Sequence, residues 1–305
     1  MNLNSSSYWQ KGGLQIGQII RLLAMTLVSV ITPVRPGREL EDPEDYLHQV
    51  WNSLKQQTYQ DWEWLIQLDA IDTPTEQWVP AEALLDPRVK PGCVGRSYGG
   101  ATAVVRNSAL SRAEGDICIP LDDDDMLLPN TLEEVAESFA NHPRAAMLAG
   151  HAYMLQDGQI LQRERPPFPA GIIPDGMIIE RWKETGATGF HYNAAAFKRS
   201  YLLHEGGWPG VVMSEDSFLF MSMAQKYPVI HLDHEIMIWR IHPGGTSQDP
   251  NTPIIRSWVK KLAALHLASQ AGGGEFLEED FLRATHQRQP TAKTSTGLTL
   301  EDLGL

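Results

Sequence analysis

The sequence predicts an α/β protein with a single Rossmann-like, mostly parallel central sheet, flanked by helices and followed by a short helical C-terminal extension. Short β-branched runs alternate with amphipathic stretches from residue 27 to residue 141, which is the pattern of right-handed βαβ units. Acidic residues follow two of these runs, at Asp69 and at Asp122–Asp125. Because ligands of such sheets bind at the carboxyl ends of the strands, these two acidic positions also predict a site.

The elements of the first half follow from short runs of apolar residues. Runs rich in β-branched or aromatic residues predict strands over residues 27–32, 62–69 and 116–121. Apolar residues at helical spacing predict helices that begin at Pro43, span 101–114 and surround 132–139. Pro120 cannot donate a ladder hydrogen bond, so we expect it at the end of its strand or on a bulge.

The second half of the chain is less regular. The turn Gln156-Asp157-Gly158 between apolar stretches predicts a hairpin. Residues 165–189 are rich in proline and glycine and predict a long loop, a feature that is usually functional or mobile. An amphipathic helix is predicted over 254–268, then a weaker helix after Gly272-Gly273-Gly274 and a disordered polar tail from about residue 286.

Composition narrows the possible functions. The 305 residues are 42% hydrophobic and 21% charged, which is ordinary for a globular protein. A net charge of −13 argues against nucleic acid as a partner, but not against a nucleotide whose phosphates are held through a metal ion. Two cysteines without a CxxC pair, Cys93 and Cys118, indicate a reduced, cytoplasmic protein. The alternative interpretation is a single disulfide between them.

The N-terminal region carries an apolar lead-in over residues 14–34, interrupted by polar side chains and by Arg21. No apolar run is long enough to span a bilayer, so we expect no transmembrane segment. The alternative interpretation is that this lead-in contacts a membrane surface.

The four consecutive aspartates, Asp122–Asp125, predict a metal site. Neighbouring carboxylates repel one another where a buried strand ends, and a hard divalent cation such as Mg²⁺ or Mn²⁺ is a natural counter-charge. If the strand continues, its side chains alternate, so Asp122 and Asp124 face one way and Asp123 points away. Asp125 is then a candidate to hold the metal-binding residues in place without binding the ion itself. The alternative interpretation is a solvated acidic turn.

A series of stretches, taken in order, resembles glycosyltransferase family 2 with the GT-A fold, over about residues 26–247. They are Val28–Pro33, Leu65–Asp69, Arg106–Asp125, Gly206–Asp216 and Trp239–Ser247. The most specific is Arg106–Asp125, in which an Arg-Asn helix, a Gly-Asp turn, a strand and the acids keep the family's order and spacing. The chain departs from the family's Asp-Asp-Gly-Ser turn, where it has Asp69-Ala70-Ile71-Asp72.

The resemblance implies a metal-dependent enzyme that moves a sugar from a nucleotide-diphosphate donor to a hydroxyl acceptor. It divides the chain into a tail with an apolar lead-in (1–25), a GT-A domain (26–250), and a helical extension with a polar tail (251–305). Within the domain, residues 26–150 form the nucleotide-sugar half and residues 151–250 the acceptor half. The sugar, the nucleobase, the acceptor and the oligomeric state stay open.

The resemblance also implies residue roles. Asp216 is similar to the general base that takes the acceptor proton, with Glu215 beside it, and direct attack with one base implies inversion at the anomeric carbon. The implied ligands of Mn²⁺ or Mg²⁺ are Asp122, Asp124 and His242. The implied donor-binding residues are Thr32, Pro33, Asp69, Asp72, Arg106, Asp122, Asp123 and Arg240, of which Asp123 is expected to matter least. The residues expected at the acceptor are Trp182, His191, Tyr192 and Trp208.

Each role has a competing structural interpretation. An acid at a helix start, such as Glu215 or Asp216, often only caps the helix, and Arg106 could face solvent. The aromatic residues could be ordinary packing, and His242 an ordinary surface or core histidine. His231 and His234 are interpreted as polar strand residues and not as a metal pair, because no third ligand with zinc spacing lies nearby.

Two rival functions are open at this stage. A nucleotidyltransferase that makes the activated sugar would need a Gly-rich phosphate loop after the first strand, where residues 33–38 contain one glycine. A nucleotide- or carbohydrate-binding protein without activity would not need intact acids at positions 122, 124 and 216.

Overall fold

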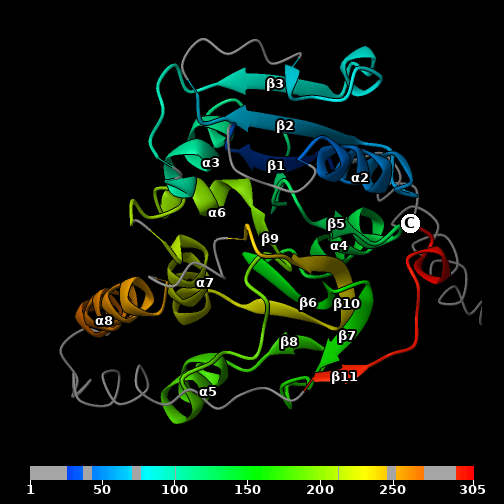
Figure 1. Cartoon of the computed structure of the whole chain (residues 1–305). Helices are drawn as coiled ribbons and strands as arrows, with labels where there is room; N and C mark the ends of the chain where they lie inside the picture. Colours follow the sequence, from blue (N-terminus) through cyan, green and yellow to red (C-terminus); the bar gives the residue numbers. More distant parts are fainter. Residues whose placement is uncertain are drawn as a thin grey trace, which may run out of the picture.

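The computed structural model describes residues 26–36, 43–70, 77–99, 101–211, 213–245, 252–270 and 293–305. These residues form one mixed sheet with helices packed on it (Figure 1). The strands are β1 (Val28–Val34), β2 (Trp62–Leu68), β3 (Val89–Cys93), β4 (Ile117–Pro120), β5 (Met126–Leu127), β6 (Met147–Gln156), β7 (Gln159–Arg163), β8 (Gly171–Ile173), β9 (Ala195–Lys198), β10 (Val229–Ile241) and β11 (Lys293–Ser295).

The helices of the described residues are α2 (Pro43–Lys55), α3 (Thr102–Leu110), α4 (Thr131–Asn141), α5 (Met177–Thr185), α6 (Arg199–His204), α7 (Glu215–Lys226) and α8 (Thr252–Gln270). Two short 3-10 turns are η2 (Ala83–Leu85) and η4 (Glu301–Leu303). The main path of the sheet runs β11-β7-β6-β9-β4-β1-β2-β3, and β10 pairs with β5, β6 and β8. The predicted α/β fold with one central sheet is confirmed, and the sheet is mixed, because antiparallel strands join its parallel ones.

The first half of the chain supplies a parallel block in which β1 lies between β2 and β4, and β3 pairs with β2. Both faces of this block are covered, and the Trp51 ring of α2 stacks on the Trp64 ring of β2, with centroids 6.0 Å apart. The three strands predicted in this half are confirmed, as are helices from Pro43 and around 132–139. Pro120 is the last residue of β4, as its missing N–H predicts.

Helix α3 is shorter than predicted, because it ends at Leu110 and not at Glu114. The backbone after α3 instead hydrogen-bonds to the buried Glu63. Its Oε1 accepts from the N–H groups of Glu114 (2.7 Å) and Gly115 (3.3 Å). A Cβ at Gly115 would lie 2.6 Å from the Leu27 carbonyl oxygen. Gly115 therefore permits a close backbone approach and does not terminate the helix.

The second half of the chain adds antiparallel pairings to the sheet, because β9 pairs in that sense with both β4 and β6, while β10 runs parallel to β6. The predicted hairpin is confirmed as β6–β7, and its turn residues Asp157 and Gly158 have φ values of 51° and 73°. The long loop predicted over residues 165–189 is partly wrong, since it contains β8 and α5. Glycines with positive φ bound α5 at both ends, so the glycine-rich composition marks helix termini there.

The C-terminal region also departs from its prediction. The helix predicted over 254–268 is confirmed as α8, which lies beside α7 (Figure 1). The weaker helix predicted after residue 274 lies outside the described residues. The tail is not disordered over residues 293–305, because β11 pairs with β7. Four leucines of this segment pack on the sheet beside β5 and β10; they are Leu298, Leu300, Leu303 and Leu305.

Both cysteines are free thiols in the structure. Cys118 is buried in β4, and the Cys93 thiol donates to the Ala70 carbonyl oxygen (2.9 Å). In the part of the chain that the structure describes, no helix combines the length and the apolar character needed to cross a bilayer.

Candidate active site

The four aspartates form a turn and not the end of a strand. Strand β4 stops at Pro120, and the Asp125 N–H donates to the Asp122 carbonyl oxygen (3.3 Å). The alternation expected from a continuing strand is therefore wrong. The turn instead brings carboxylate oxygens of Asp122, Asp124 and Asp125 within 4.8 Å of one another. Asp123 is not part of this triad, although it is also buried.

Asp125 is the most deeply buried member of the triad, with 1% of its surface exposed. Its Oδ1 accepts the Arg240 N–H (2.9 Å), whereas its buried Oδ2 has no hydrogen-bond partner among the described residues. Burial, and then the neighbouring carboxylates of Asp124 and Asp122, raise the pKa of Asp125 well above its usual range. A buried oxygen without a partner amid like charges fits an oxygen-liganded divalent cation.

The C-terminal end of β10 closes over the triad. His242 Nε2 lies 2.9 Å from Asp124 Oδ2, and Arg240 Nε donates to the Asp124 carbonyl oxygen (3.0 Å). The structure thus places both predicted residues against the acids. The Tyr46 ring of α2 contacts both side chains, with its centroid 4.5 Å from the Arg240 guanidinium carbon and 5.3 Å from the His242 ring. Gln49, also on α2, accepts a hydrogen bond from Arg240 Nη2.

Arg106 connects the acidic turn to the start of α7. Its side chain is 2% exposed, so the solvent-facing interpretation is wrong. The guanidinium donates to Asp122 Oδ1 (2.5 Å) and to Glu215 Oε1 (2.7 Å). The other oxygen of Asp122 accepts from the Asn193 amide (2.7 Å). Asp122 is thus already held by two protein donors, whereas Asp125 Oδ2 has no hydrogen-bond partner among the described residues.

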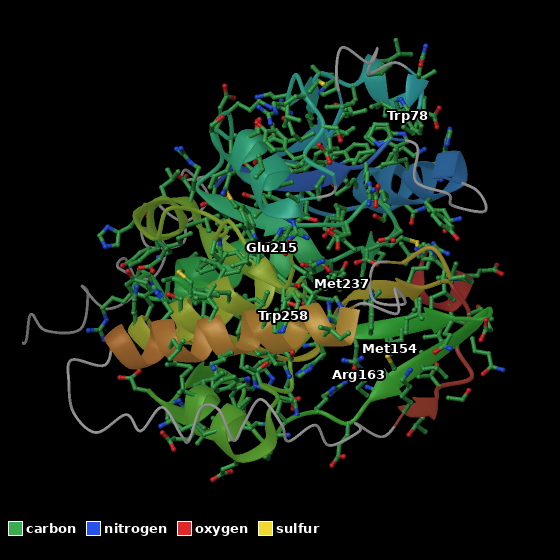
Figure 2. The ribbon with its side chains drawn as sticks, turned by 60° about the vertical axis from the view of Figure 1, so that its left-hand side comes forward. Trp78, Met154, Arg163, Glu215, Met237 and Trp258 are labelled. Atoms are coloured by element: carbon green, nitrogen blue, oxygen red, sulfur yellow. The ribbon has the colours of Figure 1, made fainter. Side chains whose placement is uncertain are left out.

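Glu215 and Asp216 begin α7 after Ser214, which has a positive φ of 61°. In Figure 2, Glu215 lies near the middle of the molecule. Burial raises the pKa of Glu215 to about 7, against the opposing effect of Arg106. Burial also raises the pKa of Asp216, whose Oδ1 accepts from the Ser217 N–H (2.6 Å) and hydroxyl (3.2 Å). The two acids differ, because Glu215 is buried against Arg106 while Asp216 is only half-buried.

The Arg-Asn and Gly-Gly-Trp stretches meet in one contact. Asn107 donates to the Trp208 carbonyl oxygen (2.8 Å), and its own amide oxygen accepts the Trp208 N–H (2.9 Å). Gly207 has a φ of +79°, and a Cβ there would lie 2.2 Å from the Asn107 amide oxygen. This paired hydrogen bond fixes α3 against the segment that leads into α7, and so positions Arg106 relative to Glu215.

The sequence matches the model of one known protein family. The model described as Glycosyl transferase family 2 matches residues 29–204, which is more than half of the chain. The chain belongs to glycosyltransferase family 2. The matched range includes Arg106 and the acidic turn, and it ends before Asp216.

Two curated relatives match part of this family 2 chain. The O-antigen biosynthesis protein RfbC of Myxococcus xanthus is 32% identical over 160 residues, which are 52% of this chain and 12% of RfbC. The putative teichuronic acid biosynthesis glycosyltransferase TuaG of Bacillus subtilis (strain 168) is 31% identical over 137 residues, which are 45% of this chain and 51% of TuaG. The chain thus matches about half of TuaG and a small part of RfbC.

Solved structures share the fold. S. aureus TarS 1-349 in complex with UDP-GlcNAc superposes with a TM-score of 0.63 at 21% identity, covering 84% of this chain and 70% of that one. The mannosyltransferase PcManGT from Pyrobaculum calidifontis, in complex with GDP-Man and Mn²⁺, gives a TM-score of 0.53 at 16% identity, covering 90% and 77%. The GT-A fold expected for a family 2 chain is therefore confirmed.

The donor-side residues predicted from the family differ in their surroundings. The Asp69 carboxylate accepts the Tyr98 N–H (2.5 Å) at the end of β2, which is where a base contact is expected. The Thr32 side chain is wholly buried and accepts a hydrogen bond from the Trp64 indole (2.8 Å), so it packs the sheet and does not face a donor. Pro33 is half-buried in β1, and Asp72 lies outside the described residues.

The predicted acceptor residues separate into two groups. The Trp182 and Trp208 side chains are each 1% exposed, which favours the packing interpretation for both. His191 and Tyr192 are partly exposed, and burial lowers the pKa of His191 to about 3. The buried His191 Nδ1 has no hydrogen-bond partner among the described residues.

Sequence reasoning missed several residues that the structure brings to the site. They are Tyr46, Gln49 and Asn193. Tyrosine, glutamine and asparagine are frequent in ordinary surfaces and turns, and only the fold brings these three to the acids. The one available signal was the position of Asn193, two residues after His191 in the same aromatic stretch.

Proposed function

We propose that the chain transfers a sugar from a nucleotide-diphosphate donor to a hydroxyl acceptor, with the help of a divalent cation and with inversion at the anomeric carbon. One observation carries the proposal. The acidic triad, with the unpartnered Asp125 Oδ2, is linked through Arg106 to Glu215, the residue directly before Asp216. One buried arginine therefore connects the proposed cation site to the start of the helix that carries the candidate base.

The cation would be held by Asp124 and Asp125, with Asp122 and His242 beside them. Mn²⁺ or Mg²⁺ bound there supplies a Lewis acid for the leaving diphosphate. The oxygen-rich donor set suits these hard ions. The presence of Mn²⁺ in the PcManGT complex, which shares this fold, supports the choice of ion.

Asp216 is proposed as the general base for the acceptor hydroxyl. It is more accessible than Glu215, and its raised pKa makes it a stronger base than an ordinary aspartate. Glu215 is proposed to position Arg106, because its carboxylate is directed into the ion pair. Tyr192 and His191 would face the acceptor, whereas Asp69 would meet the nucleobase.

The donor class is proposed from the ligands of the similar structures. TarS was solved with UDP-GlcNAc and PcManGT with GDP-Man, so a UDP- or GDP-sugar is the first donor to test. The acceptor is proposed only as a hydroxyl group, since no contact in the site selects among glycans, lipids and smaller molecules. A cytoplasmic location is proposed from the two free thiols.

The test combines ligand-induced stabilisation with a base variant. A thermal-shift panel of UDP-, GDP- and TDP-sugars, with and without Mn²⁺, identifies the donor, and transfer is then measured with that donor. We expect Asp216→Asn to lower kcat about 10²–10⁴-fold, with the donor-induced shift retained. The matched control is Asp157→Asn in the exposed β6–β7 turn, where asparagine accepts the positive φ. Activity of Asp216→Asn close to that of the control would contradict the proposed role.

A further inference from the structure

Strand β10 carries an irregularity away from the acidic triad. Along its parallel pairing with β6, His231 lies opposite Ala149, and Glu235 lies opposite His151. Three residues of β10 therefore oppose the single residue Gly150 of β6. Bulges of this kind redirect side chains and are over-represented next to functional sites. Here the bulge contains Asp233, and it brings that carboxylate to two histidines on neighbouring strands.

The two histidines face each other with their ring nitrogens. His151 and His231 are 5% and 1% exposed, and their Nε2 atoms lie 3.0 Å apart. His231 Nδ1 lies 2.9 Å from the Pro169 carbonyl oxygen, which can only accept, so this nitrogen carries the proton and Nε2 has a lone pair. His151 then donates from Nε2 in the ion-free pair.

This spacing is close to that of a metal-bound pair. Two imidazole nitrogens at about 2.0–2.1 Å from one tetrahedral ion lie about 3.3 Å apart. Ion binding needs only that the His151 proton move from Nε2 to Nδ1, so no net proton is released. The carbonyl that holds His231 Nδ1–H is the kind of outer partner that fixes a metal-binding histidine.

The surrounding charges favour a cation. Asp233 offers a carboxylate oxygen within 4.8 Å of a ring nitrogen of each histidine, and its side chain is 52% exposed. Arg165 lies 3.7 Å from that carboxylate, but its Nη2 is paired with Glu235 at 2.6 Å. Two carboxylates thus share the Arg165 guanidinium, so the Asp233 carboxylate has no arginine of its own in this contact.

We propose that His151, His231 and Asp233 bind a transition-metal ion of the Zn²⁺ class, at a site distinct from the acidic triad. Imidazole ligands suit Zn²⁺, whereas the all-oxygen triad suits Mn²⁺ or Mg²⁺. Three protein ligands leave the fourth position to water. The inference does not depend on the proposed transfer reaction.

The ion would connect the sheet to the segment that carries the acceptor residues. Its ligands lie on β6 and β10, and the Pro169 carbonyl fixes one of them. The Phe190 ring, directly before His191, stacks on the His151 ring with centroids 5.4 Å apart. A bound ion therefore holds this loop on the sheet beside the proposed acceptor side.

The test is a calorimetric titration of Zn²⁺ into the full chain after chelation, with excess Mg²⁺ present to occupy the acidic triad. We expect one equivalent of Zn²⁺ to bind and to raise the melting temperature. Asp233→Asn should weaken binding at least about 10-fold, and His231→Gln should abolish it. The matched control is His234→Gln, because His234 is adjacent, 47% exposed and paired with Glu134 instead. Its affinity for Zn²⁺ should equal that of the wild type.

The exposed Asp233 keeps the test decisive if the buried histidine variants fail to fold. Replacement of Zn²⁺ by Co²⁺ adds a spectroscopic readout, since tetrahedral Co²⁺ absorbs strongly in the visible range. Absence of stoichiometric Zn²⁺ binding to the wild type would overturn the inference. Equal affinities for Asp233→Asn and His234→Gln would also overturn it. The Asp216→Asn variant should bind Zn²⁺ as the wild type does, whatever its transferase activity. Failure of one proposal is therefore distinguishable from failure of the other.

Discussion

Arg106 is the residue on which the geometry of the site depends. A buried guanidinium without counter-charges is strongly unfavourable, and here Asp122 and Glu215 provide them at 2.5 and 2.7 Å. The same contacts orient two acids that lie far apart in the sequence. Arg106 therefore fixes the distance between the cation side and the base side of the site.

Gly207 gives a prediction at the scale of one residue. Gly206 and Gly207 both have positive φ, but only at Gly207 would a Cβ collide with Asn107, at 2.2 Å. Gly206→Ala should cost about 1–2 kcal/mol of folding free energy from backbone strain alone. Gly207→Ala should cost about 1–3 kcal/mol more, because it also disrupts the hydrogen bonds between Asn107 and Trp208. Urea unfolding of both variants measures the difference, and equal costs would refute the positioning role of this contact.

The sequence predicted which residue types meet at the candidate site, but not how they are arranged. Acids, Arg106, Arg240 and His242 carry recognisable side chains in recognisable order, and the structure brings them together. The grouping of Asp125 with Asp122 and Asp124 was not predicted, because side chains alternate only along a strand and β4 ends at Pro120. Whether Trp182 faces a ligand or the core depends on packing from distant elements, which residue type does not encode.

Among the elements, those of the parallel block were predictable and the short antiparallel strands were not. Runs such as 28–34 and 62–68 are β-branched or aromatic and are buried along nearly their whole length. In contrast, β5 has two residues and β8 has three, so neither shows a periodicity. These strands exist because β10 offers them a hydrogen-bonding edge. Tertiary context decides such elements.

The C-terminal segment gives a prediction at the scale of an element. Its four half-buried leucines pack against a cluster that includes Met126, directly after Asp125. Deletion of residues 293–305 should lower the free energy of unfolding by about 3–4 kcal/mol, at roughly 1 kcal/mol for each leucine. Glu301→Ala, an exposed change in the same segment, should stay within about 0.5 kcal/mol of the wild type. Denaturant titration checks both, and an unchanged stability of the truncated chain would show that the packing of this segment contributes nothing.

At the scale of the whole molecule, the sheet brings together parts that the sequence keeps apart. The parallel block of the first half ends in the acidic turn, and β10 of the second half returns to cover it with Arg240 and His242. A mixed sheet allows this return, because β10 runs parallel to β6 and antiparallel to β5. The order of strands could not be predicted from local patterns, since it depends on pairings between distant segments.

A cation bound at the acidic triad should depend on the carboxylate of Asp125. The measurement is the melting temperature of the wild type and of Asp125→Asn, in chelator and in Mn²⁺ with UDP. In chelator the variant should be at least as stable as the wild type, because it removes a buried carboxylate amid like charges. With Mn²⁺ and UDP, the wild type should gain stability and the variant should not. Equal gains for both proteins would contradict a cation bound at the triad.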